Sequence, residues 1–140
     1  MKFWSKQWKS SKKPGKQRKY RYNAPFHVKR KFISAHLSKE LKEKYNRRSF
    51  PARKGDEVEI MRGKFKKKTG RISRVNLKKS KVYIDGVTQK KVDGTDVQVP
   101  IDPSNLRIIN LSLEDEKRLK ALKRSLGEKH VKTSEKTKST

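Results

Sequence analysis

The chain of 140 residues contains no cysteine, no long apolar run and no acidic residue before Glu40. Without cysteine there are no disulfides and no thiolate metal sites, which fits a reducing compartment. No apolar stretch approaches the ~20 residues of a membrane-spanning helix. The N-terminal residues also lack the apolar segment of a secretory signal. We therefore expect neither a membrane span nor secretion.

Apolar residues are scarce, and acidic residues are greatly outnumbered by basic ones. Hydrophobic residues make up 30% of the chain and charged residues 39%, too little apolar material for one large core. There are 41 Lys and Arg against 14 Asp and Glu, so the formal net charge is +27. A compact body with this charge repels itself unless a polyanion neutralises it. We expect a small core with basic extensions, and nucleic acid as the partner.

The sequence has no group of residues typical of catalysis or metal binding. His27, His36 and His130 are scattered, with no carboxylate or cysteine at ligand spacing. The segment from Gly63 to Gly70 superficially resembles a phosphate-binding loop, but it lacks the second glycine before Lys-Ser/Thr. We therefore expect no enzyme activity, no metal, no cofactor and no small-molecule substrate.

Residues 1–22 form a basic arm with interleaved aromatic side chains. It is either a disordered solubilising tail or an arm ordered by RNA, with aromatics packed on bases or on the protein body. We favour the second, because aromatics are depleted in merely disordered tails. Trp4 and Trp8 lie four apart beside lysines, so a membrane-surface or partner helix stays open. The candidate RNA-binding residues here are Lys12, Lys13, Lys16, Arg18, Lys19, Tyr20 and Arg21.

Residues 23–51 have the pattern of short helices. Asn23 can cap a first helix with Pro25 in its first turn, and Ser38 can cap a second. The remaining faces are basic, and we expect them to bind RNA through Lys29, Arg30, Lys31, Arg47 and Arg48.

Residues 52–109 alternate between apolar and polar residues in short runs separated by turn signals. The odd spacing of Ile72 and Val75 predicts a bulge, and Asp93-Gly94 predicts a hairpin. About five short strands with frequent turns indicate a small all-β barrel and a mainly β fold. Residues 110–127 have the pattern of a C-terminal helix, with a capping box from Ser112 to Asp115 and Gly127 at its end. Residues 128–140 form an expected flexible basic tail.

The most informative local feature is a basic loop, residues 62–71, between two predicted strands. Gly63 and Gly70 allow positive φ at its two ends. A tight loop crowded with positive charge is unfavourable unless an anion faces it, while Phe65 either stacks on a base or anchors the loop inward. The candidate RNA-binding residues in and just before this loop are Arg53, Lys54, Arg62, Gly63, Lys64, Phe65, Lys66, Lys67, Lys68, Thr69 and Arg71.

The pattern Gly-Asp-x-Val-x-Ile-x-x-Gly-x-x-Lys…Thr-Gly-x-Ile from Gly55 to Ile72 resembles a KOW motif. The flanking segments extend the resemblance from Lys16 to about Lys123, to the KOW-motif ribosomal protein family of the large subunit. This family is numbered twenty-four in bacteria and twenty-six in eukaryotes, and the chain is similar to its archaeal/eukaryotic form. The flanking segments are Lys16-Gln-Arg-Lys-Tyr…Tyr-Asn-Ala-Pro25, Leu37-Ser-Lys-Glu-Leu…Tyr45, Arg47-Arg48-Ser49, Ile101-Asp-Pro-Ser-Asn105 and Asp115-Glu-Lys-Arg118.

The resemblance implies an SH3-like barrel that binds large-subunit ribosomal RNA, in the ribosome of the cytoplasm and beside neighbouring ribosomal proteins. It also implies early binding near the 5′ domain of that RNA, close to the peptide exit tunnel. Residues 62–71, 16–21 and 47–48 match the motif and the basic arms that bind RNA in the family. The family usually has glycine where this chain has Lys67, so we expect the loop to bend differently there.

The alternative is a KOW-type transcription elongation or RNA-chaperone module. We favour the ribosomal protein, because a regulatory module would sit beside a second folded domain. Here basic extensions flank the KOW region instead, and no second domain fits the sequence.

Overall fold

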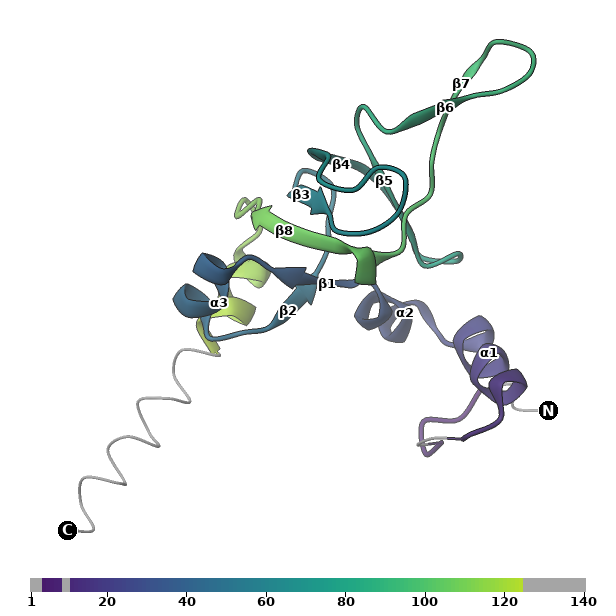
Figure 1. The fold of residues 1–140 in the computed structure, drawn as a ribbon. Helices are drawn as coiled ribbons and strands as arrows, with labels where there is room; N and C mark the ends of the chain where they lie inside the picture. Colours follow the sequence, from purple (N-terminus) through teal and green to yellow (C-terminus); the bar gives the residue numbers. More distant parts are fainter. Residues whose placement is uncertain (1–3, 9–10, 125–140) are drawn as a thin grey trace.

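The computed structural model describes residues 4–8 and 11–124, and it combines four helices with a six-stranded sheet and a separate hairpin (Figure 1). Residues 116–124 are helical. The other elements, in chain order, are α1 (Pro14–Asn23), α2 (Phe26–Phe32), β1 (Ser34–Leu37), α3 (Lys39–Tyr45), β2 (Ser49–Pro51), β3 (Glu57–Ile60), β4 (Thr69–Asn76), β5 (Lys81–Ile84), β6 (Thr88–Lys90), β7 (Asp96–Gln98), a 3-10 turn (Pro103–Asn105) and β8 (Leu106–Asn110).

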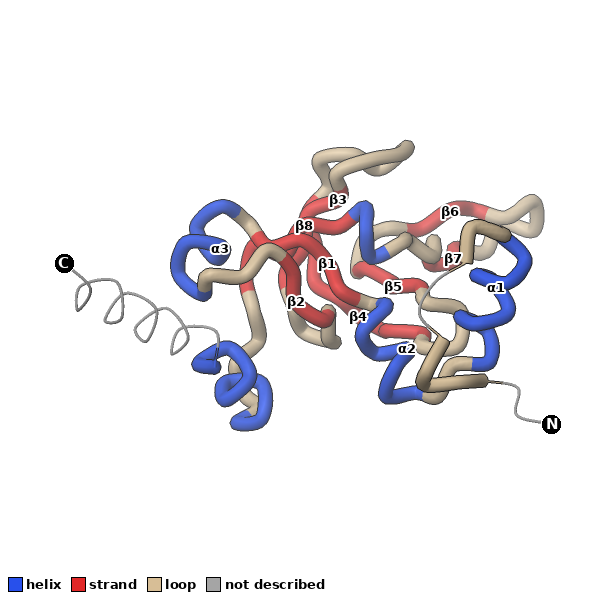
Figure 2. Tube along the Cα trace, turned by 90° about the horizontal axis from the view of Figure 1, so that it is seen from below, coloured by secondary structure: helices blue, strands red, loops and turns tan. Residues whose placement is uncertain are grey.

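The strands of the sheet follow the order β2-β1-β8-β3-β4-β5. β1 runs parallel to β8, with His36 opposite Arg107, and the other neighbours are antiparallel. β6 and β7 pair only with each other and form a hairpin that projects from the body (Figure 1). Figure 2 shows the sheet between two groups of helices, with α1 and α2 at one end and α3 at the other.

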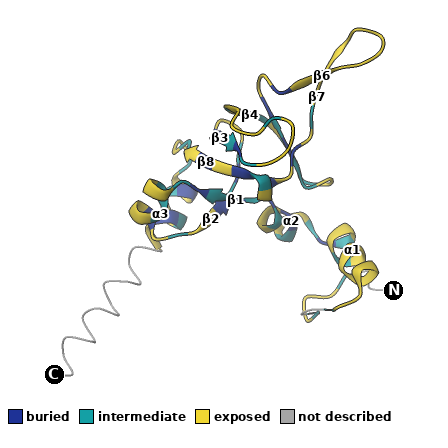
Figure 3. Cartoon of the chain, in the orientation of Figure 1, coloured by how far each residue is buried: buried dark blue, intermediate teal, exposed yellow. Residues whose placement is uncertain are grey.

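The core is built from alternating side chains of neighbouring strands. In β1, β3 and β5 every second residue is buried, as the two-residue period of a strand with one face inward requires. Leu122 brings the helix of residues 116–124 onto this core. By contrast, α1 has no buried residue and β6 and β7 are exposed throughout, as the yellow colouring in Figure 3 shows.

Several local predictions are confirmed. The bulge appears as a register shift between Ile72 and Arg74 in the pairing of β4 with β5. Asp93-Gly94 lies in the turn of the β6–β7 hairpin, where Gly94 has a φ of 83°. Ser38 caps α3, because its side chain accepts a hydrogen bond from the Leu41 amide.

The prediction of a mainly β fold needs a correction, because the described residues form a mixed α/β fold. Residues 23–51 contain β1 and β2 in addition to α2 and α3. β1 and β2 are only four and three residues long, and β1 pairs with the distant β8. The local sequence pattern therefore does not predict these strands. Asn23 ends α1 instead of capping α2, for which no side-chain cap is found.

The predicted ends of the chain also differ from the structure. The basic arm contains α1, which starts at Pro14, a residue well suited to a first helical turn. The C-terminal helix begins after Asp115, whose carboxylate accepts a hydrogen bond from the Lys117 amide at 2.7 Å, so Asp115 caps it instead of Ser112. Its expected end at Gly127 and the tail of residues 128–140 lie outside the described residues.

Candidate nucleic-acid interface

The basic loop connects β3 to β4, and its last three residues, Thr69, Gly70 and Arg71, belong to β4. Two backbone hydrogen bonds close it: the Lys67 amide donates to the Ile60 carbonyl at 2.8 Å, and the Ile60 amide donates to the Lys68 carbonyl at 2.9 Å. A loop held by its own backbone is shaped before any ligand arrives, which lowers the ordering cost of binding.

Phe65 packs against the core and so anchors the loop inward, which is one of the two alternatives predicted for this side chain. The Lys68 ammonium lies 5.8 Å from the centre of the Phe65 ring and donates to the Gly86 carbonyl at 2.9 Å. The loop therefore rests on the body of the protein while its basic side chains remain exposed.

The backbone of the loop differs from the expectation at two positions. Gly63 has the expected positive φ of 93°, but Lys67 also has a positive φ, of 69°, so the loop keeps a left-handed residue where the family usually has glycine. Gly70 is needed for space and not for positive φ. A Cβ atom there would lie 2.7 Å from Ile84 Cγ2 and 2.8 Å from the Asp85 carbonyl oxygen.

The charges of the basic loop are not compensated within the described part of the chain. The ion pairs of the described residues join Arg53 to Asp115, Lys81 to Asp102, Arg107 to Glu59, Arg118 to Asp56 and Lys120 to Glu116. None of these pairs includes a residue of the basic loop. Exposed cations held close together attract anions, and phosphates are the anions that this geometry suits.

The basic arm forms a second basic surface, and three of its aromatic residues pack on one another while Tyr22 is exposed. The Tyr20 ring stacks on Trp8 with centroids 4.4 Å apart and also contacts Trp4 and Phe32. This packing corresponds to one of the two arrangements expected for an ordered arm. The basic side chains of the predicted site in this region are all exposed: Lys12, Lys13, Lys16, Arg18, Lys19 and Arg21.

The predicted residues of α2 divide between two roles. Lys29 is 8% exposed, and its ammonium donates to the Tyr22 carbonyl at 2.7 Å and lies over the Tyr22 ring. Its charge therefore joins α2 to the end of α1. Arg30 and Lys31 are exposed and remain available to a ligand.

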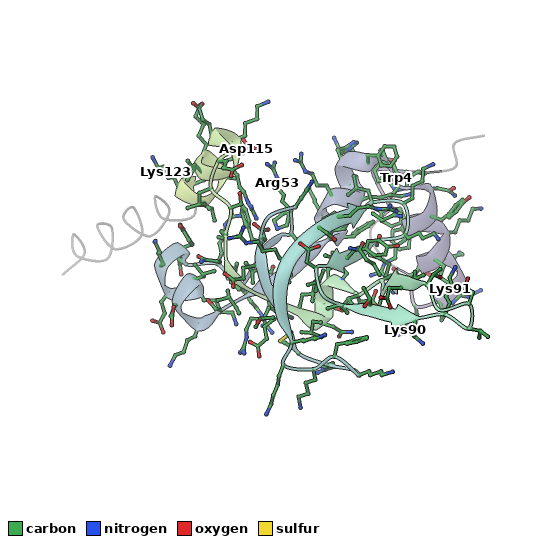
Figure 4. All side chains as sticks on the ribbon, turned by 90° about the horizontal axis from the view of Figure 1, so that it is seen from above. Trp4, Arg53, Lys90, Lys91, Asp115 and Lys123 are labelled. Carbon is green, nitrogen blue, oxygen red and sulfur yellow. The ribbon has the colours of Figure 1, made fainter. Side chains whose placement is uncertain are left out.

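The remaining predicted residues lie near β2 and the C-terminal helix. The Arg47 guanidinium lies 5.5 Å from the centre of the Phe50 ring, whereas Arg48 and Lys54 are exposed. Arg53 forms an ion pair with Asp115, and the two labelled side chains lie next to each other in Figure 4. The hydrogen bond from Arg53, with that from the Lys117 amide, lowers the pKa of the Asp115 carboxyl below its ordinary value.

Sequence reasoning missed a buried ion pair between Asp56 and Arg118. The guanidinium donates to both carboxylate oxygens, at 2.6 and 2.7 Å, and neither residue is more than 3% exposed. Asp56 also accepts from the amides of Arg53 and Ser112, at 2.9 and 3.0 Å. The sequence suggested only a turn aspartate here, and partners separated by 62 positions in the chain leave no local signal.

The preformed basic loop with its unpaired cations, and α1 with its exposed cations, define the class: a protein suited to binding nucleic acid. Comparison with known proteins gives a particular family. Residues 11–125 match the family of ribosomal proteins described as L26 in eukaryotes and L24 in archaea, and the chain belongs to this family. It is 49% identical over 116 residues to the large ribosomal subunit protein uL24 of Methanosphaera stadtmanae, an alignment that covers 83% of this chain and 99% of that protein.

Membership of this family confirms the resemblance noted in the sequence. The chain is a ribosomal protein of the archaeal/eukaryotic type, it acts in the ribosome of the cytoplasm, and it is not an enzyme. Within the described residues, no helix is long and apolar enough to cross a membrane.

Proposed function

We propose that this chain is a structural constituent of the large ribosomal subunit and binds its ribosomal RNA through the basic loop and the basic arm. The observation that carries the proposal is the basic loop, closed by its own backbone, anchored by Phe65 and without an ion-pair partner among the described residues. The name of the relative from Methanosphaera stadtmanae, a large ribosomal subunit protein, supports the choice of subunit.

The family resemblance extends this proposal to an SH3-like barrel, to early assembly and to a position near the peptide exit tunnel beside other ribosomal proteins. Two features support barrel closure. An isolated bridge pairs Val82 of the edge strand β5 with Ile101. The chain then passes through the 3-10 turn directly into β8, which lies on the other side of β3. The segment that pairs with β5 therefore continues into β8, and this connection brings the two ends of the strand series β8-β3-β4-β5 toward each other, as closure of a barrel requires.

The proposal is tested by sedimentation of a lysate from cells that express the tagged chain. We expect co-migration with the large subunit at low salt and release in high salt, because phosphate contacts release counterions and weaken as salt rises. Migration with RNA polymerase, or at the top of the gradient in low salt, would instead favour the transcription module.

A further inference from the structure

We propose that a hollow beside Phe50 receives one unpaired nucleotide of RNA, with its phosphate among the cations of the rim and its base against the Arg47 guanidinium. This inference rests on the proposed RNA binding and adds a specific subsite to it. The hollow has a volume of 490 Å³, and α2, β2 and the start of the C-terminal helix supply its walls.

The charge of the hollow favours a phosphate. Five cationic side chains line it, against a single carboxylate, that of Asp115: Arg30, Arg47, Arg53, Lys117 and Arg118. Arg53 and Arg118 are committed to Asp115 and Asp56. The side chains of Arg30, Arg47 and Lys117 have no ion-pair partner within the described part of the chain. Arg30 and Lys117 are therefore free to bind the phosphate, Arg30 with two donors at once, while Arg47 is free to face the base.

The shape of the hollow favours a single nucleotide over a duplex. Phe50 is 4% exposed, so its ring cannot itself stack on a base. Both Arg47 and Arg118 place their guanidinium groups over this ring, 5.5 and 5.4 Å from its centre. A guanidinium held on a ring keeps its orientation, and bases of splayed-out nucleotides stack on such planar groups in RNA-binding proteins. A duplex would touch only the rim, because its bases stay inside the helix.

Arg118 lines the hollow and forms the buried ion pair with Asp56, which we call the central ion pair. Arg118 belongs to the C-terminal helix, and its bonds to Asp56 and to the Ser112 and Pro51 carbonyls hold that helix against β2. Lys117, which lies on the same helix and lines the hollow, is therefore positioned by bonds formed elsewhere. Preorganisation of this kind increases affinity by reducing the cost of ordering.

The test compares Arg47→Lys with Arg74→Lys in the full-length chain. Both substitutions keep the charge and remove a guanidinium that lies over an aromatic ring, but Arg74 lies over Tyr83, outside the hollow and outside the predicted site. The probes are a short RNA duplex with one bulged nucleotide and the same duplex without the bulge. Binding is measured at fixed salt, and thermal unfolding shows that each variant is folded.

We expect Arg47→Lys to weaken binding of the bulged RNA roughly fivefold or more, the size of one lost stacking contact, and to leave the plain duplex unchanged. Arg74→Lys should change neither. Equal losses on both RNAs, equal effects of the two variants, or no loss for Arg47→Lys would overturn the hollow as a nucleotide site while leaving RNA binding intact. A wild-type chain that binds neither RNA would overturn the proposed function as well.

Discussion

The basic loop and the central ion pair both contain cationic side chains, but they hold them in different ways. At the centre, Arg118 and Asp56 are buried and fully engaged with each other and with the backbone. In the basic loop, four successive residues from Lys66 to Thr69 are exposed, and the lysines among them have no carboxylate partner in the described chain. A paired charge thus positions the fold, whereas unpaired charges remain available to a ligand.

The largest expected effect is on the central ion pair. Asp56→Asn leaves the Arg118 charge buried without its counter-charge, so we expect the free energy of unfolding to fall by about 3–5 kcal/mol. Denaturant unfolding measures this loss. As a control, Glu59→Gln removes the partner of Arg107 in a partly exposed pair and should cost less than about 1 kcal/mol. Similar losses of unfolding free energy in the two variants would show that the buried pair does not stabilise the fold more than the exposed pair.

The next effect concerns RNA binding by the loop. Replacing Lys66, Lys67 and Lys68 together by Gln should leave folding intact or slightly improve it, because like charges are removed from one place. Each phosphate contact contributes about 0.7–0.9 to the slope of log K against log salt, so the slope should fall by about two to three. Near 0.1 M salt, this corresponds to a loss of affinity on the order of a hundredfold.

The control for this triple variant removes three exposed lysines from outside the predicted site, Lys78, Lys79 and Lys123, and so has the same net charge. It should weaken binding much less. An unaltered affinity and salt slope in the loop variant would show that the loop does not face RNA.

The third prediction concerns the junction between the loop and the core. Gly70→Ala places a Cβ atom 2.7 Å from Ile84 and 2.8 Å from the Asp85 carbonyl, so β4 or β5 must shift. We expect a loss of about 1–3 kcal/mol in unfolding free energy, typical of overpacking. Gly15→Ala is the matched control, because a Cβ atom there meets nothing within 4 Å. Its stability should be unchanged or increased, and a comparable loss there would count against the steric explanation.

The smallest expected effect is at Lys67. Its positive φ disfavours a side chain, so Lys67→Gly should raise the unfolding free energy by up to about 1 kcal/mol. Lys66→Gly, next to it and without positive φ, should give no such gain. Thermal unfolding distinguishes the two variants, and a destabilised Lys67→Gly would mean that the side chain makes contacts that outweigh the backbone strain.

The sequence predicted what depends on neighbouring residues. The alternation of Val58 with Ile60, the Asp93-Gly94 turn and the Ser38 cap are local, and each appears in the structure. The pairing of β1 with β8 and the bond between Asp56 and Arg118 join distant parts of the chain, and no residue pattern revealed them. In the predicted site the residue types indicated positive charge, but not that Lys29 is buried, because burial depends on how α1 meets α2.

The parallel pairing of β1 with β8 has a consequence for how this protein is made. β1 is synthesised early, but His36 and Leu37 find Arg107 and Ile108 only after most of the chain has emerged. Contacts so distant in sequence close slowly, because a long segment must be ordered first. The strand is therefore without one of its neighbours during most of translation, while the cationic arm that precedes it is already exposed. The core is therefore completed late, and the exposed cations of the basic arm are available before the sheet is complete.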